Sequence, residues 1–170
     1  MRILLSFGLT GLVAAPAFAA DLEISIEIPK LDVAEYHKPY VAIWLERPDQ
    51  SVAANLAVWY DVANKKQEGD KWLKDLRQWW RRAGRNVTVP ADGLTSATRA
   101  PGAHAIKFED SHAALKALAP GEYQLIVEAA REVGGREVVK IPLQWPPEKG
   151  AALNAKGEHE LGTVAVTVKP

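Results

Sequence analysis

The stretch LEISIEI (residues 22–28) alternates apolar and polar residues with a period of two, which is typical of a β-strand with one buried face. The stretch YVAIWLE (residues 40–46) is similar and ends at the turn sequence RPDQ. Because this turn is short, residues 52–61 are predicted to return antiparallel to the second strand. The folded part of the chain is therefore expected to begin as a β-meander.

The same alternation continues to the C-terminus. It predicts strands at residues 104–109, 123–130, 137–145 and 163–168, with a Gly-Gly turn joining the second and third of them. A short helical turn is expected near residue 113, and residues 146–159 read as a plain loop. Seven or so short strands with one inserted helix predict a mainly β fold, an antiparallel two-sheet sandwich of immunoglobulin-like type.

The inserted helix is predicted from KWLKDLRQWWRRAG (residues 71–84), where the period changes. Its apolar residues recur at helical spacing along one stripe, and Gly84 is expected to end it. The stripe contains Trp72, Leu76, Trp79, Trp80 and Ala83. The opposite face is basic and contains Lys71, Lys74, Arg77, Arg81 and Arg82. This face is either a solvated surface or a patch for an anion or an acidic redox partner.

The N-terminal sequence MRILLSFGLTGLVAAPAFAA combines one arginine, an apolar run and the small-x-small pattern that signal peptidase cuts. We expect residues 1–19 to be a signal peptide, cleaved near Ala19, and residues 20–170 to form one β-sandwich domain in the periplasm. Asp21 and Glu23 interrupt the apolar run too early for a membrane-spanning segment. With no cysteine, the exported chain must be stabilised by its core alone.

Composition and standard motifs exclude several functions. Basic and acidic residues balance at 21 each, which argues against general nucleic-acid or membrane-surface binding. The glycines form no phosphate-binding loop, no serine lies in a nucleophile elbow, and no metal-ligand spacing occurs. A self-sufficient hydrolase or nucleotide enzyme is not expected. A composite metal or haem site assembled by the fold would draw first on His37 and His104, which flank predicted strand starts.

The six tryptophans fall into two groups. Trp44, Trp59 and Trp145 lie in predicted strands and are expected in the core. The others lie on the helix stripe, where Trp79 and Trp80 are adjacent and cannot point the same way. One of these two is therefore expected to line a groove beside the following loop.

That loop, DGLTSATRAPG (residues 92–102), carries a resemblance to a modification site. It is similar to the flavinylation motif of proteins modified by bacterial FAD:protein FMN transferase, which reads Asp, small, any, Ser or Thr, Gly or Ser, Ala, and an acceptor Thr or Ser. The matching residues are Asp92, Gly93, Leu94, Thr95, Ser96, Ala97 and Thr98. The resemblance implies that the Thr98 hydroxyl takes FMN from FAD with magnesium, forming a phosphoester. Ser96 departs from the more usual glycine.

The residues suit that chemistry. A hydroxyl that must enter another enzyme's active site is expected on an exposed, deformable loop with small neighbours, which Gly93, Ser96 and Ala97 supply. Arg99 follows the acceptor position and is expected to pair with the phosphate charge of the ester.

A wider pattern resembles a DUF2271-like family of predicted periplasmic proteins. It runs from residue 24 to about residue 168 through KPYVAIWLERPD, WLKDLRQWWR, DGLTSATRAPG and PGEYQLIVEAARE. The resemblance implies an association with FAD:protein FMN transferases and PepSY-type membrane reductases, and hence a role in electron transfer.

Two functions follow as hypotheses. The first is a periplasmic electron-transfer protein with covalent FMN on Thr98, more a flavin carrier than an enzyme. Trp79 or Trp80 is then expected to stack on the flavin, and Arg99, Arg81 or Arg82 to neutralise its phosphate. The alternative is a non-redox immunoglobulin-like binding module whose Trp-rich surface holds a ligand or a protein partner.

Overall fold

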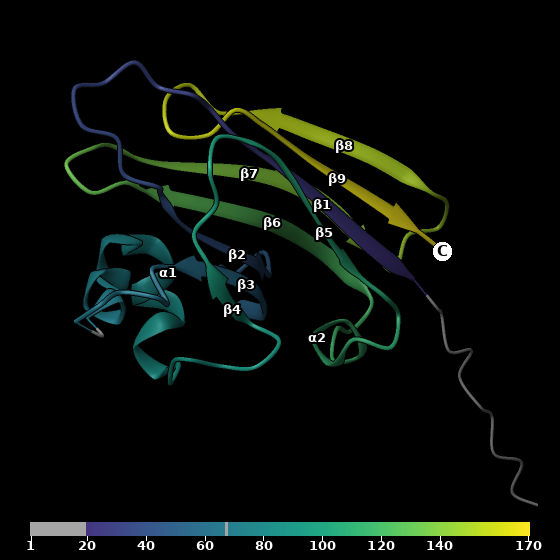
Figure 1. Cartoon of the computed structure of the whole chain (residues 1–170). Coiled ribbons are helices and arrows are strands. Elements are labelled where there is room, and N and C mark those ends of the chain that lie inside the picture. Colours follow the sequence, from purple (N-terminus) through teal and green to yellow (C-terminus); the bar gives the residue numbers. More distant parts are fainter. Residues whose placement is uncertain (1–19, 67) are drawn as a thin grey trace, which may run out of the picture.

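The computed structural model describes residues 20–66 and 68–170, so the predicted signal peptide, residues 1–19, lies outside the described residues. Two sheets pack face to face (Figure 1). The strands are β1 (Asp21–Ile28), β2 (Tyr40–Glu46), β3 (Val52–Tyr60), β4 (Thr95–Ala97), β5 (Gly102–Phe108), β6 (Gly121–Ala130), β7 (Arg136–Trp145), β8 (Ala151–Lys156) and β9 (Thr163–Lys169). One sheet has the order β5-β1-β9-β8 and the other β4-β3-β2-β6-β7. The mainly β sandwich is confirmed, and its immunoglobulin-like detail stays a prediction.

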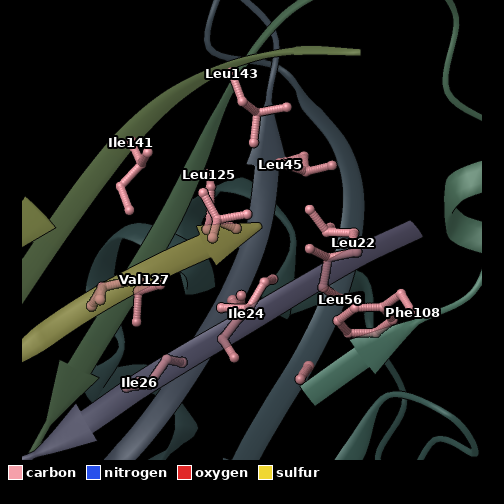
Figure 2. Packing of buried hydrophobic residues seen from close by; sticks show 14 of the residues in the cluster. Leu22, Ile24, Ile26, Leu45, Leu56, Phe108, Leu125, Val127, Ile141 and Leu143 are labelled. Carbon is pink, nitrogen blue, oxygen red and sulfur yellow. The ribbon is translucent and has the colours of Figure 1, made fainter. Parts of the chain in front are cut away.

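The alternating stretch at residues 22–28 becomes the inner strand β1, paired antiparallel with both β5 and β9. Its apolar residues Leu22, Ile24, Ile26 and Ile28 are each at most 2% exposed and point between the sheets, where they meet side chains of β2, β3, β6 and β7 (Figure 2). The period-two prediction is confirmed because only one face of this strand meets the opposite sheet.

Strand β2 is buried on both faces. Val41, Ile43 and Leu45 join the core between the sheets, whereas Ala42 and Trp44 join a second apolar cluster on the outer face of the five-stranded sheet. Because successive side chains of a strand point to opposite faces, a strand covered on both sides needs a nearly continuous apolar sequence. The sheet must therefore be covered by another element on its outer side.

That cover is the segment between β3 and β4, which lies beside these strands (Figure 1). Leu73, Leu76 and Trp79 of this segment are at most 1% exposed and pack on Trp44 and its neighbours. The prediction of one continuous α-helix over residues 71–84 is wrong. The segment consists of the 3-10 helix η1 (Gly69–Asp75), the α-helix α1 (Arg77–Arg82) and the 3-10 turn η2 (Gly84–Asn86).

The break falls at Leu76, whose ψ of 70° is not helical. The two helical pieces therefore have different phases, so no single stripe faces the sheet. Leu73 is buried in place of Trp72, which is 47% exposed. The predicted basic face is confirmed as solvent-exposed at all five of its residues, Lys71, Lys74, Arg77, Arg81 and Arg82.

Helix α1 has only six residues and begins on a carboxylate from β6. Glu128, which is fully buried, accepts hydrogen bonds from the backbone N–H groups of Gln78 (3.0 Å) and Trp79 (2.7 Å), and its charge is paired with Arg136. A negative charge at the first turn satisfies amides that have no partner inside the helix. A long-range contact thus fixes where this helix starts.

One further difference concerns a strand. The plain loop predicted over residues 146–159 is wrong, because β8 lies inside it and pairs antiparallel with β9. This edge strand has alternating half-buried and exposed residues and is rich in alanine, a combination with little strand signal in sequence. The short helical turn is confirmed as α2 (Ala113–Lys116).

Within the described residues, no helix has the length and apolar character that a membrane crossing requires.

Candidate functional site

The motif at residues 92–98 folds as a turn followed by the short strand β4. Gly93 occupies the turn with φ +72°, a conformation that glycine adopts without strain. The Thr95 hydroxyl closes the turn, because it donates to the Ala91 carbonyl (3.0 Å) and accepts from the Ala91 N–H (2.9 Å). Asp92 is exposed at the start of this turn.

Residues 95–97 then pair parallel with the end of β3, so the expectation of a deformable acceptor loop is corrected for these three residues. The pairing continues one step further, because the Thr98 N–H donates to the Tyr60 carbonyl at 3.1 Å. The backbone at Thr98 is therefore held at the sheet edge, and its half-buried side chain is the first one beyond the strand. Ser96 is half-buried and Ala97 exposed.

Thr98 lines a pocket of about 320 Å³, a size within the range typical of small-molecule sites. The pocket lies where β2 begins and where β3, β4 and β6 end, since Tyr40 is opposite Ala130 in the sheet and Tyr60 is opposite Ala97. Its walls come from five separate parts of the chain. They are Tyr36, His37, Lys38, Tyr40, Asp61, Asn64, Trp72, Asp75, Thr98, Ala130 and Glu132.

Tyr40 forms a rigid part of this wall. Its hydroxyl donates to the Gly69 carbonyl at 2.9 Å, and its ring packs edge-on against Tyr60 with 6.3 Å between centroids. Gly69 is required there, because a Cβ atom would collide with the Asp61 carbonyl oxygen. Burial raises the pKa of Tyr40 to about 12, so the phenol keeps its proton at neutral pH.

The remaining walls are polar and largely acidic. His37 contacts the carboxylates of Glu35 at 2.9 Å and Glu132 at 3.5 Å. Asn64 donates to Asp61 at 3.1 Å, which orients this carboxylate. With Asp75 also present, the acidic side chains of the wall outnumber the cations, which are Lys38 and His37 when protonated. An anion is therefore disfavoured inside the pocket, whereas a neutral ring is not.

Arg99 turns away from the pocket wall and lies over Trp59, with the guanidinium carbon 4.9 Å from the ring centroid. His104 packs edge-on against the same indole at 5.9 Å, and its Nε2 lies 2.7 Å from the Ala100 carbonyl oxygen. Trp59 is buried in the core, so these contacts anchor the chain directly after Thr98.

The other predicted flavin neighbours lie elsewhere. Trp79 is fully buried, and its indole N–H donates to Asn55 at 2.9 Å. Trp80 is half-buried against the outer apolar cluster. Arg81 and Arg82 line a different pocket beside Gln50, and Arg82 is engaged by Glu46 at 3.2 Å. Among the described residues, none of these four lines the pocket that contains Thr98.

The tryptophans predicted in the core, Trp44, Trp59 and Trp145, are confirmed there at no more than 5% exposure. Of the two histidines, His37 joins the pocket of Thr98, and His104 does not line it. In the described part of the chain, no three His, Cys, Asp or Glu side chains are grouped so that they could hold a metal ion.

Most of the pocket had no signal in the sequence. Tyr36, Asp61 and Asn64 belong to no motif, and they meet Tyr40 only because β2 and β3 are neighbours in the sheet. Helical periodicity over residues 71–84 predicts Trp72 on the buried stripe, because the sequence carries no signal for the break at Leu76. A cluster of aromatic residues at predicted strand ends is the one sequence feature that could have suggested the site.

The fold and the site define a β-sandwich protein with an aromatic and polar pocket at one end of its five-stranded sheet. The chain belongs to the family described as "Predicted periplasmic protein (DUF2271)", whose model matches residues 21–163. The family description places the protein in the periplasm, as the N-terminal sequence predicts. No curated protein and no solved structure matches the chain.

Proposed function

We propose that this protein is a periplasmic electron-transfer protein that carries FMN as a phosphoester on Thr98. The observation that carries the proposal is that Thr98 both completes the flavinylation motif and lines an aromatic pocket. FMN would supply reversible one- or two-electron chemistry that the side chains of this protein lack. A covalent bond would keep the flavin on the protein outside the cytoplasm.

Attachment balances as a phosphoryl transfer. The Thr98 oxygen forms a bond to the FMN phosphorus of FAD, the bond from this phosphorus to the bridging oxygen breaks, AMP leaves, and the hydroxyl proton is released. The FAD:protein FMN transferase would supply the magnesium and the active site. Because β4 is a three-residue strand at the sheet edge, it is paired on one side only, which favours its access to a second protein.

Electrons would come from a membrane reductase of PepSY type or another redox protein. The exposed basic face of the segment before β4 supports this proposal, since it offers a cationic surface to an acidic partner. The Trp-rich surface required by the alternative, a non-redox binding module, is less well supported. Four of the six tryptophans are buried, which leaves Trp72 exposed and Trp80 half-buried.

Co-expression with an FAD:protein FMN transferase tests the proposal. Wild-type protein is expected to show flavin fluorescence that survives denaturing electrophoresis, and a mass increase equal to FMN less one water. Thr98→Ala should lose both signals. Thr98→Ser should retain them, because the motif accepts either hydroxyl, and Thr88→Ala, an exposed threonine outside the motif, should behave as wild type.

Two results would contradict the proposal in different ways. Unmodified wild-type protein in the presence of an active transferase would rule out the flavin carrier. A Thr98→Ala variant that is loaded as fully as wild type would rule out Thr98 as the acceptor while leaving the carrier function intact.

A further inference from the structure

We infer that the pocket beside Thr98 is the seat of the flavin's isoalloxazine ring and that Trp72 stacks on one face of this ring. The inference rests on the proposed function, because it needs FMN on Thr98. It replaces the expectation that Trp79 or Trp80 covers the flavin with a different residue on a different wall.

The first argument is proximity. Thr98 is itself a lining residue, so a flavin bound to its hydroxyl begins its path at the pocket wall. The ribityl phosphate chain has several rotatable bonds, which allow the ring to fold back towards its attachment point. A short flexible tether creates an effective concentration of roughly millimolar order, so even a weak ring site is filled.

The second argument is the exposure of Trp72. Trp72 is 47% exposed, although an aromatic residue of this size is highly buried on average. Trp72 lies in η1 beside the buried Leu73 and lines the pocket, and Lys74 lies over its ring at 5.8 Å from the centroid. The ring face that Lys74 does not cover is available for offset stacking on a flat heterocycle.

The third argument is the match of charge. The acidic wall formed by Asp61, Asp75 and Glu132 would repel the flavin phosphate but not the neutral oxidised ring. The ester bond keeps the phosphate at the Thr98 oxygen, so the neutral ring is the part of FMN that would enter the pocket. The polar edge of an isoalloxazine carries carbonyl oxygens and one N–H, for which Lys38 offers a donor and the carboxylates offer acceptors.

The alternative positions are less suitable. Trp79 has no exposed face to offer, since it is fully buried. Trp80 packs against the outer apolar cluster and does not line this pocket. Tyr40 is fixed by its hydrogen bond to Gly69 and forms a preorganised wall rather than a mobile cover.

The test compares flavinylated wild type, Trp72→Leu and Trp80→Leu. Flavin absorbance and mass measure loading, and fluorescence per bound flavin measures stacking, because a tryptophan in contact with an isoalloxazine quenches its emission by electron transfer. Trp72→Leu should be loaded like wild type and brighter, with the residual quenching coming from Tyr36 and Tyr40 of the same pocket, and Trp80→Leu should match wild type. In denaturant all three should become equally bright, since the quenching depends on the fold.

The outcomes separate the two proposals. Loaded Trp72→Leu protein that is no brighter than loaded wild type would overturn the stacking inference and leave the flavin carrier standing. Increased brightness in Trp80→Leu alone would place the ring on the other side of the helical segment and also overturn it. Absence of flavin from wild type would instead refute the proposed function.

Discussion

At the scale of single residues, two carboxylates fix the turn before β9. The carboxylate of Glu137 in β7 accepts hydrogen bonds from four backbone N–H groups of the turn before β9, with N···O distances of 2.6 to 3.1 Å. In the same region, Glu160 pairs with Arg131 through two hydrogen bonds of 2.9 and 3.0 Å. Because charge-assisted bonds to several amides fix a turn firmly, these residues hold the β8–β9 hairpin to the other sheet.

Glu137 gives a pH prediction. Burial alone would raise the pKa of this carboxyl, but the four amide donors outweigh it and hold the pKa below the ordinary value of 4.5. The folded state therefore binds its proton less readily than the unfolded chain. The stabilisation is complete above pH 4.5 and is lost as the pH falls through the lower folded pKa.

We expect Glu137→Gln to cost about 2 kcal/mol at neutral pH and to flatten the loss of stability below pH 4.5. Urea unfolding across an acid pH series measures this, with the exposed Glu148→Gln as the control. A variant whose free energy of unfolding falls with acid as steeply as that of wild type would show that another group dominates.

At the scale of elements, the segment before β4 is helical because of where it packs. Isolated helices shorter than about 12 residues are marginal in water, and α1 has only six residues. Its first amides bond to Glu128, and Leu73, Leu76 and Trp79 are buried on the sheet. The same segment carries Trp72 to the pocket, so its docking shapes the candidate site.

Removal of the Glu128 carboxylate should weaken the packing of the helical segment on the sheet. Glu128→Ala leaves two amides and Arg136 without their buried partner, and we expect a loss of about 3 kcal/mol. Chemical denaturation measures the loss, and hydrogen exchange of the Gln78 and Trp79 amides should accelerate more than exchange in β1. Glu122→Ala, an exposed glutamate of the same strand, is the matched control. Unchanged protection at Trp79 would contradict the capping role.

At the scale of the whole molecule, one apolar core joins both sheets. Residues of β1, β5, β8 and β9 meet residues of β2, β3, β6 and β7 in a continuous cluster. Figure 2 labels members of this cluster from β1, β2, β3, β5, β6 and β7. With no cysteine in the chain, this core provides the stabilisation that disulfides give many exported proteins. The two sheets are therefore expected to unfold together.

Ile24→Ala tests this cooperation. Ile24 is fully buried at the centre of β1, so the cavity left by truncation should cost about 4 kcal/mol. Hydrogen exchange should accelerate in β6 of the opposite sheet as well as in β1, because global unfolding becomes more frequent. Val33→Ala, at a 41% exposed valine, should leave both unchanged. Acceleration confined to β1 would show that the sheets open independently.

The local pattern of apolar and polar residues predicts those strands whose faces are covered, or left open to solvent, in the same way along their whole length. The strands β1, β2, β3, β5, β6, β7 and β9 are predicted because alternation or continuous apolar sequence reports directly which faces are covered. The edge strand β8 and the break at Leu76 were missed, since pairing with β9 and the Glu128 cap are contacts between residues far apart in the chain. Strand β4 was missed for the same reason, because only pairing with β3 defines it.

The β-sandwich class, the predicted export and the motif that ends at Thr98 can all be predicted from the sequence, because each depends on residues that are neighbours in the chain. The surroundings of Thr98 depend instead on contacts that only the fold creates. The start of β2 and the ends of β3, β4 and β6 meet at one end of the sheet. The helical segment is interrupted at Leu76, directly before the helix that Glu128 of the sheet caps. This arrangement brings His37, Tyr40 and Trp72 to the same pocket, which no spacing in the sequence could predict.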